Sequence, residues 1–107
     1  MLAARDTYAT CATCHGKEGE GGEGPALASV RETFPDCEEQ VRWITLGSNR
    51  WREEVGPTYG AADTPVEGAM PTFENLGDVE IRRIAMYERV RFGGGTIEDE
   101  RRGCGLG

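Results

Sequence analysis

Residues 8–16 read YATCATCHG and concentrate most of the chemistry of the chain. Cys11 and Cys14 are separated by two residues, and His15 follows the second cysteine directly. His15 is also the only histidine among the 107 residues. Two thiols and an imidazole in this order suit three kinds of site: a redox-active thiol pair, part of a zinc site, or an attachment point for haem.

These three interpretations make different demands on the rest of the chain. A thioredoxin-like thiol pair needs a βαβ context, and the sequence shows no convincing alternating strand. A zinc site needs four ligands, and an adjacent Cys-His pair is poorly placed to bind one ion beside the other thiol. Covalent haem needs only the motif, because two thiols bond the porphyrin and the next residue presents its imidazole to the iron. The motif therefore favours haem.

Composition and charge limit the class of protein. The chain is long enough for one small domain, and with 37% hydrophobic residues, 7% aromatics and 16 glycines its core is lean. Such domains usually need a disulfide, a metal or a buried cofactor. The net charge of −7 argues against nucleic acid and anionic lipid as partners. It keeps the protein soluble, and it also suits a partner with a basic docking patch.

No run approaches the roughly 20 apolar residues of a membrane span, and the first residues do not resemble a signal peptide. We therefore expect a mature domain or a piece of a longer protein, with no direct membrane span in this chain.

Patterning predicts helices at about 2–14, 36–46 and 78–92, joined by long loops. Asp36 is a suitable N-cap for the second helix, on which Val41, Ile44 and Thr45 share one face at i, i+3, i+4 spacing. The glycine-rich segment 16–25 is a loop. Gly47 is expected to end the second helix.

The third helix shows the clearest pattern. Ile81, Ile84, Ala85, Glu88 and Phe92 form its stripe, flanked by Tyr87, and its charges are expected to lie mostly on a solvated face. Three glycines, 93–95, end it. We expect a domain over residues 1–95 and a polar tail over residues 96–107.

Residues 47–76 lack periodicity but carry large apolar side chains, so we expect them to wrap around something. Within them, Gly68-Ala69-Met70-Pro71 offers a methionine in a loop. Pro71 restricts Met70 to an extended backbone, which helps to direct its thioether. Together with the CxxCH motif, this makes Met70 the candidate for a second iron ligand opposite His15, whereas Met86 lies inside a helix and is expected to pack in the core.

The sequence resembles the class I c-type cytochromes over most of its length. The resemblance rests on CATCHG at 11–16, Gly24-Pro25-Ala26-Leu27, the GAMP loop at 68–71 and the last helix with Tyr87. It implies an all-α cytochrome c fold, with crossing N- and C-terminal helices, one or two intermediate helices and long loops around a covalent haem. The aromatic residue expected four positions before the first cysteine is displaced here, with Thr7 at that place and Tyr8 following it.

The resemblance also implies roles for single residues. Cys11 and Cys14 would hold one haem c, with its iron bound by His15 and Met70, and the Pro25 carbonyl would accept a hydrogen bond from the other nitrogen of His15. Trp51 and Tyr59 are the favoured donors to the haem propionates, which need hydrogen bonds if they are buried, and Arg50 and Arg52 are less favoured alternatives.

Two cysteines remain. The resemblance implies haem attachment outside the cytoplasmic membrane of a bacterium, where disulfides persist. Cys37 and Cys104 either pair or stay as two separate thiols, and we expect them to pair.

Taken together, the sequence predicts a monomeric one-electron carrier with His/Met ligation that is not an enzyme on its own. We expect it in the periplasm, or otherwise outside the cytoplasmic membrane of a bacterium, where it meets redox protein partners, and a membrane anchor in the full-length protein stays open. Two alternatives stay open. One is an electron-entry domain of a larger oxidoreductase or terminal oxidase. The other is a ligand-binding or peroxidase-like haem protein with a labile Met70.

Overall fold

The computed structural model describes residues 28–67 and 70–106, and within these ranges it is predominantly helical. Its elements are α3 (Val30–Thr33), α4 (Cys37–Glu54), β1 (Thr58–Tyr59), β2 (Thr64–Pro65), the 3-10 turn η1 (Glu74–Leu76), α5 (Asp78–Arg91) and α6 (Ile97–Gly103). Strands β1 and β2 form one short antiparallel pair. The predicted all-α class is therefore confirmed, while the predicted helix over 2–14 and its crossing with the last helix lie outside the described residues.

Helix α4 begins where the sequence predicts. The Asp36 carboxylate accepts a hydrogen bond from the backbone N–H of Glu38 at 2.9 Å, which satisfies one of the free N–H groups of the first turn. Val41 and Ile44, two of the three residues expected on one face, are buried in the core.

The predicted end of this helix at Gly47 is only partly right. Gly47 has φ 74° and ψ 173°, which interrupts the helical geometry, but the chain resumes helical structure and continues to Glu54. Patterning did not anticipate the second part because this part has no apolar stripe of its own. Of its residues, Ser48 and Trp51 are buried.

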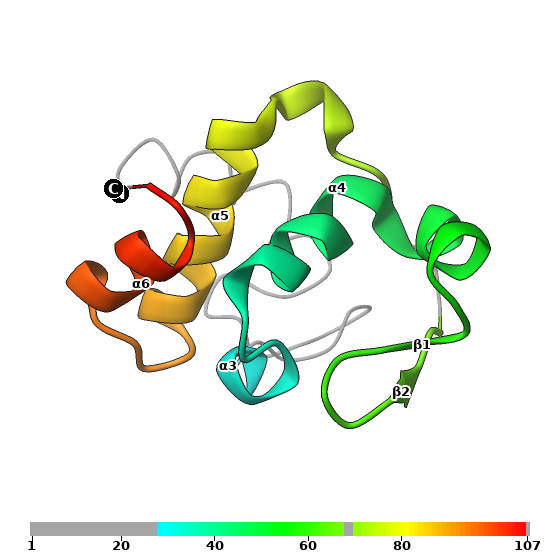
Figure 1. The fold of residues 1–107 in the computed structure, drawn as a ribbon, viewed down its shortest axis with the longest axis horizontal. Helices are drawn as coiled ribbons and strands as arrows, with labels where there is room; N and C mark the ends of the chain where they lie inside the picture. Colours follow the sequence, from blue (N-terminus) through cyan, green and yellow to red (C-terminus); the bar gives the residue numbers. More distant parts are fainter. Residues whose placement is uncertain (1–27, 68–69, 107) are drawn as a thin grey trace.

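Helix α5 lies between α4 and α6 (Figure 1). Its predicted stripe is confirmed at Ile81, Ile84 and Ala85, each of which is at most 2% exposed. Met86 also belongs to the core, as expected from its position inside the helix. Most charged residues of α5 are exposed, as expected, but Arg89 is buried beside Glu88, which the predicted stripe already included.

Residues 96–107 were expected to form a tail, but the structure has α6 there. Thr96 caps this helix by accepting from the backbone N–H of Asp99 at 3.2 Å. Helix α6 packs on α5, and just after it Cys104 lies at bonding distance from Cys37, the first residue of α4. The two residues are almost completely buried.

Among the helices of the described residues, none combines the length and the apolar character that crossing a membrane requires.

Candidate functional site

Four of the residues singled out from the sequence, Cys11, Cys14, His15 and Pro25, lie outside the described residues. Their roles in holding haem therefore stay predictions from the sequence. What the structure does describe is the opposite side of the predicted site: Met70 and the residues that hold its segment.

Met70 is held through its backbone by the residue that follows Gly47. The Met70 N–H donates to the Ser48 hydroxyl at 2.7 Å, and the Ser48 backbone N–H donates to the Met70 carbonyl at 3.0 Å. Two residues farther on, past Pro71, the Thr72 hydroxyl donates to the Thr45 carbonyl at 2.6 Å. Helix α4 thus binds the methionine segment on both sides of Pro71.

The absence of a side chain at Gly47 permits this close approach. A Cβ at position 47 would lie 2.6 Å from the Met70 carbonyl oxygen and 2.8 Å from backbone atoms of Pro71 and Thr72. The positive φ of Gly47 is also one that residues with a Cβ rarely adopt. The break in α4 at Gly47 is therefore also the place where the methionine segment packs against the helix.

The Met70 side chain is half-buried and packs against the hydrophobic core together with Phe73 and Leu76. A thioether is an established axial ligand for haem iron when paired with an imidazole. The Met70 thioether, on a residue whose backbone is fixed at the edge of the core, fits the role of an iron ligand.

Four aromatic side chains gather near the start of β1. Trp43 and Tyr59 stack with ring centroids 4.4 Å apart, Trp51 meets Trp43 edge-on at 5.2 Å, and Phe34 stacks on Tyr59 at 6.0 Å. Such pairs stabilise their neighbours beyond simple burial. The cluster packs Tyr59 against Trp43 in the first half of α4, and Trp43 in turn contacts Trp51 in the second half.

The structure gives the two favoured propionate donors different surroundings. The Trp51 indole is 1% exposed and donates its N–H to the Thr58 carbonyl at 2.9 Å. That N–H is thus occupied, and a propionate would have to replace Thr58 as its acceptor. Burial, and then the charge of Glu67, raise the pKa of the Tyr59 phenol, so Tyr59 keeps its proton and remains a donor at neutral pH.

The two alternative donors also have partners on the protein. Arg50 forms ion pairs with Glu54 and Glu74. Arg52 donates to the Asn49 side chain at 2.7 Å and to the Val66 carbonyl at 3.3 Å. The contacts with Glu74 and Val66 tie the second half of α4 to the segment that follows β2, whereas the other two lie within α4 itself.

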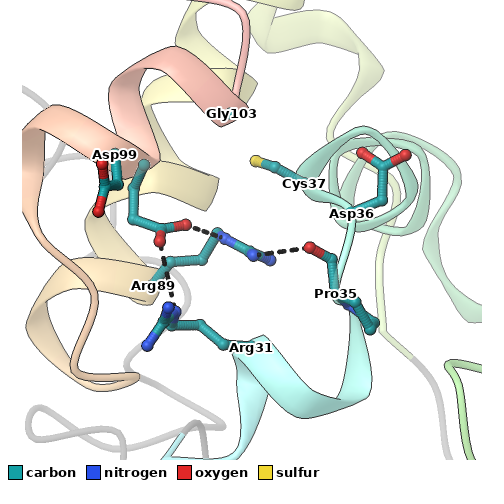
Figure 2. Close-up of a pocket in the computed structure, with 8 residues that line it drawn as sticks. Arg31, Pro35, Asp36, Cys37, Arg89, Asp99 and Gly103 are labelled. Carbon is teal, nitrogen blue, oxygen red and sulfur yellow. Dashed lines mark hydrogen bonds and ion pairs between the residues drawn. The ribbon is translucent and has the colours of Figure 1, made fainter.

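Sequence reasoning missed a buried polar network between α4, α5 and α6. Arg89 is 4% exposed and reaches toward the Pro35 carbonyl, as Figure 2 shows. Its guanidinium also donates to the Phe34 carbonyl at 2.5 Å and to Gln40 at 3.0 Å, and it pairs with Glu100 at 2.5 Å. A cavity of about 500 Å³ lies beside this arginine.

Glu88 joins the same network. Gln40 donates its side-chain N–H to the Glu88 carboxyl at 2.9 Å, and burial raises the pKa of Glu88 from its ordinary 4.5 to about 7, although the hydrogen bond from Gln40 opposes the shift. A signal was present in the sequence, since Glu88 occupies the apolar stripe of α5. The long-range partners Gln40 and Glu100 left no such signal.

Comparison with known proteins identifies the class. The family model described as Cytochrome c matches residues 3–87 of the 107. The chain therefore belongs to the cytochrome c family, whose members carry covalently attached haem c with its iron and generally transfer electrons rather than catalyse reactions. No curated protein and no solved structure matches the chain. In bacteria, domains of this family usually lie outside the cytoplasm.

Proposed function

We propose that the protein is a one-electron carrier in which His15 and Met70 are the two axial ligands of the iron. Haem c supplies the reversible one-electron chemistry, and a thioether opposite an imidazole favours the ferrous state relative to two nitrogen ligands. The observation that carries the proposal is the fixed backbone of Met70, which is bonded to Ser48 through both its N–H and its carbonyl.

The other residues serve this site by position. Cys11 and Cys14 tether the porphyrin, and the Pro25 carbonyl orients His15 by accepting from its second ring nitrogen. Tyr59 donates to a propionate, and Trp51 supports it by holding the adjacent Thr58 carbonyl. With both axial positions occupied by the protein, exogenous substrates do not reach the iron, so the protein is not an enzyme by itself.

We also propose where and with whom the protein acts. The Cys37–Cys104 pair supports an oxidising compartment such as the periplasm. The net charge of −7 supports brief, electrostatically steered encounters of a monomer with redox partners that present basic patches.

A Met70→Ala variant tests the ligand. We expect the ferric absorption that depends on a sulfur–iron bond to be lost in this variant. A Met86→Leu variant, altered in the core, should keep it. An unchanged ferric spectrum in Met70→Ala would show that Met70 is not the ligand. Rapid binding of carbon monoxide to the native ferrous protein would instead favour a haem protein with a labile methionine.

A further inference from the structure

We propose that the hydroxyl groups of Ser48 and Thr72 form a clamp that positions Met70 for the iron and sets how readily an outside ligand displaces it. This inference rests on the proposed role of Met70 as an axial ligand. Neither hydroxyl is expected to touch the porphyrin, so both are positioning residues that act through the methionine backbone.

The first half of the clamp is the Ser48 side chain. It is 1% exposed and accepts the Met70 N–H at 2.7 Å, a short distance for a bond from an amide. Because the Ser48 backbone N–H donates at the same time to the Met70 carbonyl, the peptide groups on both sides of the Met70 Cα are fixed. Two such bonds restrict rotation of the residue about its backbone.

The second half lies beyond Pro71. The Thr72 hydroxyl donates to the Thr45 carbonyl, and that carbonyl belongs to the turn of α4 that Gly47 interrupts. In an uninterrupted helix, this carbonyl would accept the N–H four residues later. The break in the helix therefore provides the groups to which the methionine segment binds.

Positioning matters for this ligand because of its chemistry. Methionine has three rotatable side-chain bonds, so its thioether samples many positions unless the backbone is fixed. A site that is held loosely loses occupancy of the productive geometry. Removing the Ser48 hydroxyl would free the Met70 N–H and lower the share of molecules in which the sulfur lies where the iron needs it.

Imidazole binding to the ferric holoprotein, followed by its absorption spectrum, measures this displacement directly. We expect Ser48→Ala to raise the apparent affinity for imidazole about fivefold, the factor that corresponds to about 1 kcal/mol for one hydrogen bond. Thr72→Val, at an exposed position where folding is not at risk, should also raise the apparent affinity for imidazole.

A matched control lies on the same helix. The Thr45 hydroxyl donates to the Val41 carbonyl within α4 at 2.7 Å, so Thr45→Val removes a hydroxyl three residues from Ser48 without touching a hydrogen bond of the methionine segment. This variant should leave imidazole affinity unchanged. If Ser48→Ala and Thr72→Val lower the stability to denaturant but bind imidazole as the native protein and Thr45→Val do, the clamp has only a structural role and the proposal is wrong.

The Met70→Ala variant separates this inference from the proposed function. If it leaves the ferric spectrum unchanged, the ligand assignment fails and the clamp fails with it. If it abolishes the sulfur–iron absorption while Ser48→Ala and Thr72→Val bind imidazole like the native protein, the ligand stands and the clamp alone is overturned.

Discussion

Replacing Gly47 by alanine should destabilise the protein far more than the same replacement at Gly103, the other glycine within α4 and α6. The new Cβ would lie 2.6 Å from the Met70 carbonyl oxygen and 2.8 Å from two further backbone atoms. All three contacts are with backbone, so no flexible side chain can move aside to relieve them.

Two costs combine at this position. The backbone conformation of Gly47, φ 74° and ψ 173°, lies in a region that is essentially restricted to glycine, and holding another residue there costs about 1–3 kcal/mol. Forcing an additional methyl group into a packed site costs about 1–3 kcal/mol more. We therefore expect Gly47→Ala to lower the free energy of unfolding by about 2–6 kcal/mol, or to displace the methionine segment from α4.

Denaturant unfolding of the ferric holoprotein measures the first outcome, and the sulfur–iron absorption of the ferric protein reports the second. Gly103→Ala is the control, because a Cβ on Gly103, in helix α6, meets no atom within 4 Å. Alanine there should be neutral or slightly stabilising. A Gly47→Ala protein within 1 kcal/mol of the native stability, with its spectrum intact, would refute the reasoning about the helix break.

Three further predictions concern the core and the C-terminal region. Burial raises the pKa of Glu88 from 4.5 to about 7, so the folded protein binds a proton at this carboxyl more tightly than the unfolded chain does. The stability contributed by this group should therefore be fully present below pH 4.5 and should be lost as the pH rises to about 7. The measurement is the free energy of unfolding of the native protein and of Glu88→Gln at several pH values. The native protein should lose stability relative to the variant by up to about 3 kcal/mol across that window. If the two proteins show the same dependence of stability on pH, the raised pKa is contradicted. Arg89→Met should cost up to about 3–5 kcal/mol in denaturant unfolding, because the buried Glu100 carboxylate loses its buried partner and keeps only the more exposed Arg31. Arg101→Met on the exposed face of α6 should change stability by less than about 0.5 kcal/mol. Replacing both Cys37 and Cys104 by serine removes a disulfide that closes a loop with a sequence separation of 67, and it should lower the free energy of unfolding by up to roughly 4 kcal/mol. The intact mass of the native protein should rise by about 2 Da on reduction if the bond is present.

Local signals predicted the parts of this fold that depend on neighbours in sequence. Asp36 as a cap, Val41 and Ile44 as a buried face, and the stripe of α5 all follow from helix periodicity and capping, and the structure confirms them. The signal for haem, in Cys11, Cys14 and His15, is likewise local, because the chemistry requires the three groups to be adjacent.

Features that depend on contacts between distant segments were not predictable in the same way. Gly47 was expected to end a helix, which is only partly right, and nothing near it in the sequence indicates that residues 70–72 fill the space left by its missing side chain. Ser48 looks like an ordinary polar residue after a glycine until Met70 is placed beside it. Similarly, Arg89 resembles the solvated arginines around it, and only the packing of α6 provides its buried partner Glu100.

The pairing of Cys37 with Cys104 has a consequence for how the protein matures. Four cysteines allow three ways of forming two disulfides, and in two of them Cys37 and Cys104 each pair with a thiol of the haem motif. If Cys11 and Cys14 attach the haem, as proposed, they must be free thiols at that step, whereas Cys37 and Cys104 must be oxidised to form their bond. The proposed site and the disulfide would then place opposite redox requirements on the same chain. Because Cys37 and Cys104 are at most 3% exposed, burial limits the access of a thiol reductant to this bond once the helices have packed, while thiols elsewhere in the chain can still be kept reduced.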